Sequence, residues 1–274
     1  MRINCKGRLI NLGKPRVMGI LNATPDSFFA GSRSLDLDSA LKKTEKMLNE
    51  GADFIDIGGM STRPGAAEIS EEEELQRVVP IVEAVIKEFP ETLISIDTYR
   101  SKVAKEAVEA GGAIVNDISA GTMDKNFLKT VADLQVPYIL MHMQGTPINM
   151  QKNPVYENVT LEVNQFLSGK IKELREMGIH DIILDPGFGF GKTVEHNYEL
   201  FQNLSLIGFG EFPLLIGISR KSLITRFLNV SANEALNGTT ALNTIALQKG
   251  ANILRVHDVK EAKETIRIWE MLKD

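Results

Sequence analysis

The chain has a single cysteine and lacks any long apolar run. With only Cys5, no internal disulfide is possible, and the composition fits a reducing compartment. No segment reaches the roughly 18 apolar residues that a membrane-spanning helix needs. Residues 1–6 contain no long apolar region of the kind found in a signal peptide. These absences predict a cytoplasmic protein.

Positive charge and metal-binding motifs are also scarce. The formal net charge is −5, which argues against a general nucleic-acid surface but leaves room for a small basic pocket. No His-Glu-x-x-His motif occurs, and one cysteine cannot build a zinc site. Residues 186–193 end in Gly-Lys-Thr like a phosphate-binding P-loop, but Pro186 occupies the position of the first glycine. We therefore expect small-molecule substrates and no P-loop.

Short apolar segments alternate with helical stretches along almost the whole chain. Apolar strands covered by helices are typical of a parallel sheet, and eight such units over about 250 residues fit a (β/α)₈ barrel. We predict one TIM-barrel domain spanning residues 1–274, with a short hairpin cap within 2–16; a doubly wound sheet is the alternative. The expected strands are 17–21, 54–57, 93–96, 113–115, 138–141, 182–184, 214–218 and 253–254. The expected helices are 35–49, 70–89, 101–110, 124–134, 158–177, 193–204, 222–228, 231–249 and 259–272.

Polar residues stand at nearly every predicted strand end. A single Asp or Asn in this position often only caps the next loop. The active sites of such barrels lie at the carboxyl face, however, so we expect the whole set to converge there. The set is Asn22, Asp56 (just inside its strand), Asp97, Asn116, His142, Asp185, Arg220, Lys221, Arg255 and His257.

The strand-end residues fall into two chemical groups. Asp97, Asn116, Asp185 and Lys221 suit a planar heterocycle, because a carboxylate accepts paired bonds from an amino-pyrimidine edge and an amide donates and accepts. The second group consists of donors for phosphoryl oxygens, and a Mg²⁺ shared with phosphates would need few protein ligands. This group is Asn22, Thr62, Arg63, Arg255 and His257.

Eight motifs in sequence order carry a resemblance to a known family. They occupy residues 18–28, 56–65, 95–98, 116–118, 141–143, 185–190, 219–222 and 255–258. In these stretches the chain resembles the dihydropteroate synthase family of folate biosynthesis. The resemblance implies a (β/α)₈ barrel, usually a homodimer. It also implies a transferase that joins 6-hydroxymethyl-7,8-dihydropterin diphosphate to p-aminobenzoate, giving dihydropteroate and pyrophosphate, and sulfonamide inhibition.

The resemblance assigns roles residue by residue. It places Asp97, Asn116, Ile118, Met141, Asp185 and Lys221 around the pterin. It places Asn22, Thr62, Arg255 and His257 at the diphosphate, with Asn22 also touching Mg²⁺. Arg63, Pro64, Phe190 and Ser222 would line the p-aminobenzoate path. The implied catalytic residues are Asn22, Asp97, Lys221, Arg255 and His257. No nucleophile–base pair is evident, which favours an ionisation-first displacement.

Two positions depart from the family pattern, and two alternative functions stay open. Ala30 lies in Phe-Ala-Gly-Ser-Arg, where the family commonly continues toward an Asp-Gly pair, and Met60 stands where Glu is frequent. Both affect expectations for the loops rather than for the pterin pocket. One alternative is a pterin-binding methyltransferase domain, which has no diphosphate to hold. The other is a non-catalytic folate-pathway binding protein.

Overall fold

Eight parallel strands form a nearly closed barrel in a computed structural model, which describes residues 1–23, 33–60 and 69–272 and omits the side chains of 33–36. The strands are β3 (Arg16–Asn22), β4 (Phe54–Gly58), β5 (Ile94–Asp97), β6 (Ile114–Asp117), β7 (Tyr138–Met141), β8 (Ile182–Asp185), β9 (Leu215–Ile216) and β10 (Ile253–Val256). Their order is β8-β7-β6-β5-β4-β3-β10-β9. A single bridge between Leu184 and Leu214 joins the two ends. The predicted TIM barrel is therefore confirmed.

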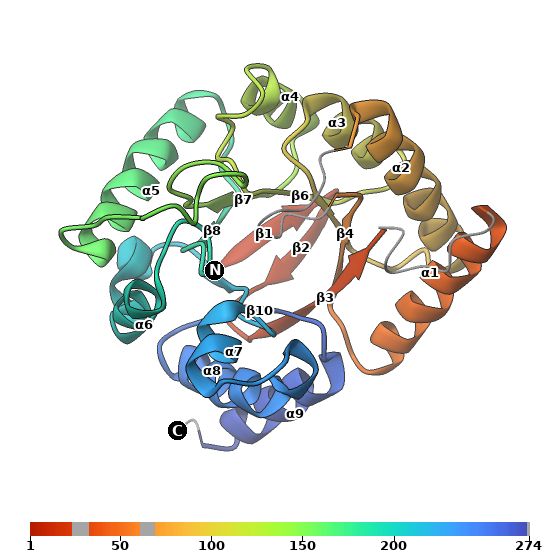
Figure 1. The fold of residues 1–274 in the computed structure, drawn as a ribbon. Helices are drawn as coiled ribbons and strands as arrows, with labels where there is room; N and C mark the ends of the chain where they lie inside the picture. The colour runs from red at the N-terminus through yellow and green to blue at the C-terminus, as the bar shows by residue number, and fades with distance from the viewer. Residues whose placement is uncertain (24–32, 61–68, 273–274) are drawn as a thin grey trace.

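A ring of helices surrounds the strands (Figure 1). The helices are α1 (Arg33–Asn49), α2 (Glu71–Glu88), α3 (Ser101–Glu109), α4 (Phe127–Leu134), α5 (Val159–Glu176), α6 (Val194–Gln202), α7 (Ser222–Leu228), α8 (Leu236–Gln248) and α9 (Val259–Glu270). The predicted capping box at α2 forms in part, since the Ser70 hydroxyl accepts the Glu73 N–H at 3.1 Å. No helix in the described part of the chain has both the length and the apolar character needed to cross a bilayer.

Several predicted boundaries were wrong. Helix α4 begins at Phe127 rather than at Asp124; Asp124 Oδ1 accepts the Asn126 N–H at 2.9 Å in the turn before the helix, and Asp124 Oδ2 accepts the Ser101 N–H at 2.7 Å. Strand β9 has two residues instead of the predicted five. A 3₁₀ segment, η2 (Leu204–Gly210), was not predicted, and η3 (Ala232–Glu234) is separate from α8. These differences lie outside the strand ends that form the predicted site, except at β9.

The predicted N-terminal hairpin closes the end of the barrel at which the strands begin, here called the lower end. Strand β1 (Arg2–Cys5) pairs antiparallel with β2 (Arg8–Asn11), and both lie inside the helical ring in Figure 1. Ile3, Cys5 and Leu12 pack against residues at the starts of the barrel strands, such as Met18 and Phe54. Burial raises the pKa of the Cys5 thiol to about 12. The N-terminal end of the barrel is thus filled by a hydrophobic layer.

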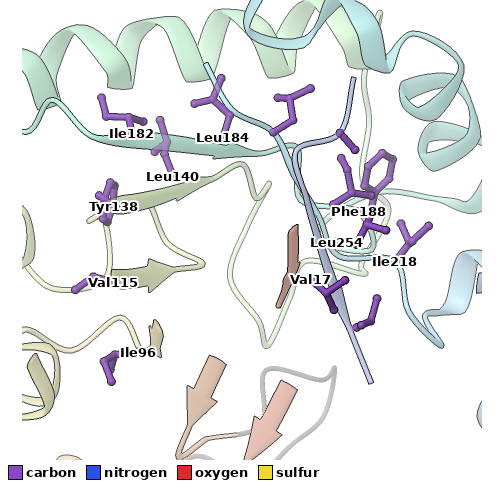
Figure 2. Packing of buried hydrophobic residues seen from close by; sticks show 14 of the residues in the cluster. Val17, Ile96, Val115, Tyr138, Leu140, Ile182, Leu184, Phe188, Ile218 and Leu254 are labelled. Atoms are coloured by element: carbon purple, nitrogen blue, oxygen red, sulfur yellow. The ribbon is translucent and has the colours of Figure 1, made fainter. Parts of the chain in front are cut away.

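Alternation along each strand separates two environments. In β8, Ile182 and Leu184, which Figure 2 labels, belong to the large core. This core also contains the buried faces of the helices. Ile183 lies between Ile182 and Leu184 and belongs to the separate layer at the lower end of the barrel. Because side chains alternate along a strand, Asp185 shares the inner side with Ile183. The same period of two places the other strand-end groups inside the barrel.

Candidate active site

The upper interior of the barrel is lined by the residues that come after the hydrophobic bottom layer. Each lies two or four positions beyond an inward-facing apolar residue, for example Asp56 after Phe54 and Asn116 after Ile114. The inner set is Asn22, Asp56, Asp97, Asn116, Met141, Asp185, Arg255 and His257. The period of two therefore explains why polar groups distant in sequence meet at one mouth.

Arg255 joins two carboxylates in the barrel interior. Its Nε donates to Asp56 Oδ2 at 2.6 Å, and its Nη2 donates to Asp97 Oδ2 at 2.7 Å. Asn116 Nδ2 donates to the same Asp56 oxygen at 3.1 Å. The other oxygen of Asp56 is buried and has no hydrogen-bond partner among the described residues. Burial lowers the pKa of Arg255, but both carboxylates raise it, and the net shift is upward.

Asp185, at the end of β8, and Lys221, after β9, lie on the side of this interior next to β10. The Asp185 carboxylate is 6% exposed and accepts the Gly187 N–H at 2.8 Å. Burial raises its pKa, and the positive charge of Lys221 opposes that rise. Lys221 Nζ donates to the Phe188 carbonyl at 2.7 Å and lies 4.7 Å from the centre of the Phe190 ring. Lys221 thus links the turn after β8 to the carboxylate of that strand.

Burial changes the protonation of two more groups. It raises the pKa of Asp97 to about 7, although the nearby Arg255 opposes the shift. It lowers the pKa of Lys221 to about 8, although Asp185 opposes the shift. Both groups therefore titrate near neutral pH, which is typical of sites where charge is used for recognition or catalysis.

An apolar wall lies beside the polar groups. Ile118, Met141 and Phe190 belong to one buried cluster with Tyr99 and Met150. Met60 packs against this cluster, and the Tyr99 hydroxyl lies 3.5 Å from its sulfur. A flat aromatic ligand could therefore stack on side chains from several strands while its edge meets carboxylates. Met60, a departure from the family pattern, extends this apolar wall.

The end of β10 is braced against the loop after β9. His257 Nδ1 lies 3.0 Å from Ser219 Oγ, and the Ser219 hydroxyl also accepts the His257 N–H at 3.3 Å. Arg220 forms a two-point ion pair with Asp258, at 3.0 Å from Nε and 2.6 Å from Nη2. The Arg220 side chain therefore braces two loops, and Lys221, not Arg220, reaches the site interior.

The structure brings together most, but not all, of the predicted residues. Asp97 and Arg255 are in direct contact, and Asn116 joins them through Asp56. Asn22 and Ser222 are half-buried at the end of β3 and the start of α7. Thr62, Arg63, Pro64 and Ala30 lie outside the described residues.

The structure gives two residues, Asp56 and Lys192, contacts at the site that their sequence positions do not indicate. The sequence places Asp56 just inside its predicted strand end and assigns it no role. The inward face of β4 was the available signal. In the sequence, Lys192 is part of an incomplete P-loop motif. In the structure it is buried, and its ammonium donates to the Gly187 carbonyl in the turn after β8. A buried lysine next to a run of glycines has no reliable sequence signature.

A separate hollow of about 490 Å³ lies between α5 and η2. Its walls include Leu167, Ile171 and Phe212, with Arg175 stacked 5.1 Å from the Phe212 ring centre. None of the strand-end groups lines it. The convergence of titratable groups, rather than the size of a hollow, identifies the barrel mouth as the candidate active site.

Comparison with known proteins gives concordant matches. The model of the family described as "Pterin binding enzyme" matches residues 18–257. Dihydropteroate synthase of Escherichia coli K12 is 46% identical over 272 residues, covering 98% of this chain and 96% of that protein. The Yersinia pestis dihydropteroate synthase, solved with a sulfonamide drug complex, superposes with a TM-score of 0.93 at 45% identity and 99% coverage of both chains. The Xanthomonas albilineans dihydropteroate synthase in complex with 7,8-dihydropteroate superposes with a TM-score of 0.89 at 36% identity, covering 99% of this chain and 98% of that one.

Proposed function

The chain belongs to the dihydropteroate synthase family of pterin-binding enzymes, and from that membership we propose how its site performs the reaction. The substrates are 6-hydroxymethyl-7,8-dihydropterin diphosphate and p-aminobenzoate, and the products are 7,8-dihydropteroate and pyrophosphate. The observation that carries the proposal is the Asp56–Arg255–Asp97 ion-pair network, which lies in the same barrel mouth as Asp185 and Lys221.

The pterin edge meets acceptors held in fixed orientations. Asn116 uses its Nδ2 group to bind Asp56, which leaves the amide oxygen to accept an N–H from the ligand. Asp185 accepts the Gly187 N–H with one oxygen and keeps the other for the amino-pyrimidine edge. Lys221 donates to a ring oxygen or nitrogen, and Ile118 and Met141 contact the ring face.

The diphosphate meets donors from β10 and neighbouring loops. A guanidinium has five N–H groups, so Arg255 retains donors for a phosphoryl oxygen after binding both carboxylates. His257, at the end of the same strand, is the second donor, and Asn22 and Thr62 complete the set. Donors at this position stabilise charge that develops on the departing pyrophosphate.

Mg²⁺ fits this site as an ion held mainly by the diphosphate. Among the described residues, no group of three His, Cys, Asp or Glu side chains is placed to hold a metal. Mg²⁺ usually keeps several waters and takes few protein ligands, so the single amide oxygen of Asn22 is compatible with it. When bound, the ion supplies neutralising charge to the leaving group.

We assign the bond changes to an ionisation-first displacement. The bond between the pterin methylene carbon and the diphosphate oxygen breaks, and its electron pair leaves with pyrophosphate. Asp97 and Asp185 lie beside the heterocycle over which the resulting positive charge spreads. The amino nitrogen of p-aminobenzoate then bonds to the methylene carbon and loses one proton. We assign the path of this second substrate to Phe190 and Ser222, and the family resemblance adds Arg63 and Pro64, which lie outside the described residues.

The deciding assay measures pyrophosphate release by the purified chain with Mg²⁺ and both substrates. We expect release to depend on p-aminobenzoate, and a sulfonamide that mimics p-aminobenzoate should compete with it. Binding of the pterin without p-aminobenzoate-dependent release would contradict the synthase function. It would instead favour the methyltransferase or binding-protein alternatives, which have no use for diphosphate donors at Arg255 and His257.

Pterin affinity should depend on pH in both directions. Asp97, with a pKa of about 7, offers a negative charge and two acceptor oxygens only when ionised, so affinity rises as pH increases through about 7. Lys221, with a pKa of about 8, donates best when protonated, so affinity falls as pH increases through about 8. Calorimetric titration with 6-hydroxymethylpterin from pH 5.5 to 9.5 measures both limbs, after correction for the ligand's own titration. Lys221→Met should remove the alkaline limb, and a flat wild-type profile would contradict the assignment.

We further propose a cytoplasmic homodimer. The buried, unpaired thiol of Cys5 supports a reducing compartment. Two apolar side chains, Ile268 on α9 and Met271 just after it, support self-association, since they are 65% and 85% exposed. Sedimentation equilibrium measures the assembly state, and a monomer at micromolar concentration would contradict the proposal.

A further inference from the structure

In the turn after β8, a side chain binds each carbonyl group from residue 187 to residue 191. Gly187, Gly189 and Gly191 all have positive φ, at 70°, 82° and 61°. A methyl group at Gly187 would overlap the His142 carbonyl, so the turn packs against the end of β7. The carbonyls of residues 187–191 accept from Lys192, Lys221, Gln151, Lys192 and Tyr156 in that order.

Lys192 makes the central contacts behind this turn. Its side chain is only 2% exposed, and its Nζ donates to the carbonyls of Gly187 at 2.9 Å and Phe190 at 3.1 Å. A third contact, of 2.9 Å, joins Nζ to His142 Nδ1. Burial lowers the pKa of His142 to about 2, so this ring is neutral and Nδ1 serves as the acceptor. When Lys192 is protonated, all three N–H groups of its ammonium are used in this way, and burial lowers its pKa to about 7.

The two lysines fix Phe190 from opposite ends. Lys192 binds the Phe190 carbonyl, whereas Lys221 lies 4.7 Å from the ring centre and binds the carbonyl of Phe188, two residues earlier. The Phe190 ring also packs in the cluster of Ile118 and Met141. A ring fixed at its backbone, its face and its edge has little freedom to change rotamer.

From this geometry we propose that Lys192 is a positioning residue for the p-aminobenzoate site. It touches neither substrate. It fixes the Gly187 and Phe190 carbonyls so that the Phe190 ring stands where the second substrate binds. This inference rests on the proposed role of Phe190 in the p-aminobenzoate path. It predicts that loss of the ammonium affects the second substrate more than the pterin, because Asp185 retains both Lys221 and the Gly187 N–H.

The test is Lys192→Met, which keeps an unbranched side chain one atom shorter and removes its three donors. We expect KM for p-aminobenzoate to rise by roughly 10- to 100-fold, because a misplacement of about 1 Å has effects of that size. Pterin affinity should change much less. Lys6→Met is the matched control, since Lys6 Nζ also binds a backbone carbonyl, that of Val108 at 2.6 Å, near the opposite end of the barrel. It should leave both KM values unchanged.

A double-substitution cycle separates positioning from a purely structural role. If Lys192 acts through Phe190, then Lys192→Met should add little to KM in a Phe190→Ala background. Additive effects would overturn the proposal, as would a Lys192→Met enzyme with lowered thermal stability and unchanged KM. Failure of both Lys192→Met and Lys192→Gln to fold would assign the lysine to barrel stability and also overturn it. An inactive wild-type enzyme would instead contradict the proposed function, so the two failures are distinguishable.

Discussion

Asp185→Ala is expected to weaken pterin binding by roughly 30-fold or more, since leaving a buried polar partner unpaired costs about 2–5 kcal/mol. The carboxylate is 6% exposed and lies at the end of β8. Its loss leaves the Gly187 N–H without its acceptor and removes the negative charge that favours the protonated form of Lys221. Calorimetric titration with 6-hydroxymethylpterin gives the affinity directly.

Two further variants identify what the carboxylate contributes. Asp185→Asn keeps the shape and one oxygen for Gly187 but loses the charge, so it should bind the pterin better than the alanine variant and worse than wild type. Asp53→Ala is the matched control, because Asp53 also accepts a backbone N–H, from Val17 at 2.9 Å, and pairs with Lys263 at 2.6 Å. It should lower stability without affecting the pterin. Unchanged affinity in Asp185→Ala would remove Asp185 from the pocket.

Arg255→Met should damage both catalysis and stability. Removing one partner of a buried ion pair typically costs about 3–5 kcal/mol, because the remaining charges are left uncompensated. Here two carboxylates, Asp56 and Asp97, lose their shared cation. Loss of a donor to developing charge lowers turnover by roughly 100- to 1,000-fold. Urea denaturation gives the free energy of unfolding, and pyrophosphate release gives the rate.

A second substitution separates these two effects. Asp56→Asn removes one of the two negative charges, so Asp56→Asn/Arg255→Met should be more stable than Arg255→Met alone. Turnover should stay low, because the donor to pyrophosphate is still missing. A normal denaturation midpoint for Arg255→Met would show that the ion-pair network does not form in solution. Recovery of turnover in the double variant would remove Arg255 from leaving-group stabilisation.

The barrel and most of its mouth were predictable from local patterns. Apolar segments bounded by glycine and followed by helical spacing indicated the eight units, and polar residues at their ends indicated the site. Barrel closure alone brings four strand-end residues close together: Asp97, Asn116, Asp185 and Arg255. Their pairing does not follow from closure, because which carboxylate Arg255 selects depends on the stagger between β4, β5 and β10.

Other features depend on contacts that sequence patterns do not encode. Segment 214–218 has the composition of a five-residue strand, yet β9 contains two residues. After β9, Lys221 turns back to bind the Phe188 carbonyl and Arg220 adopts a positive φ of 57° while pairing with Asp258. Tertiary contacts override strand propensity here. The same reason explains Lys192, whose acceptors come from a turn and from the end of another strand.

The hydrophobic layer beneath the site has a consequence for kinetic order. Ile3, Cys5 and Leu12 close the lower end of the barrel, so ligands have one entrance. We therefore expect a molecule held between the strand ends by Asp97 and Asp185 to enter before the second substrate. A product that occupies both levels must leave by the same route. The packing of the N-terminal hairpin thereby imposes a sequence of arrival and departure on reactants that it never touches.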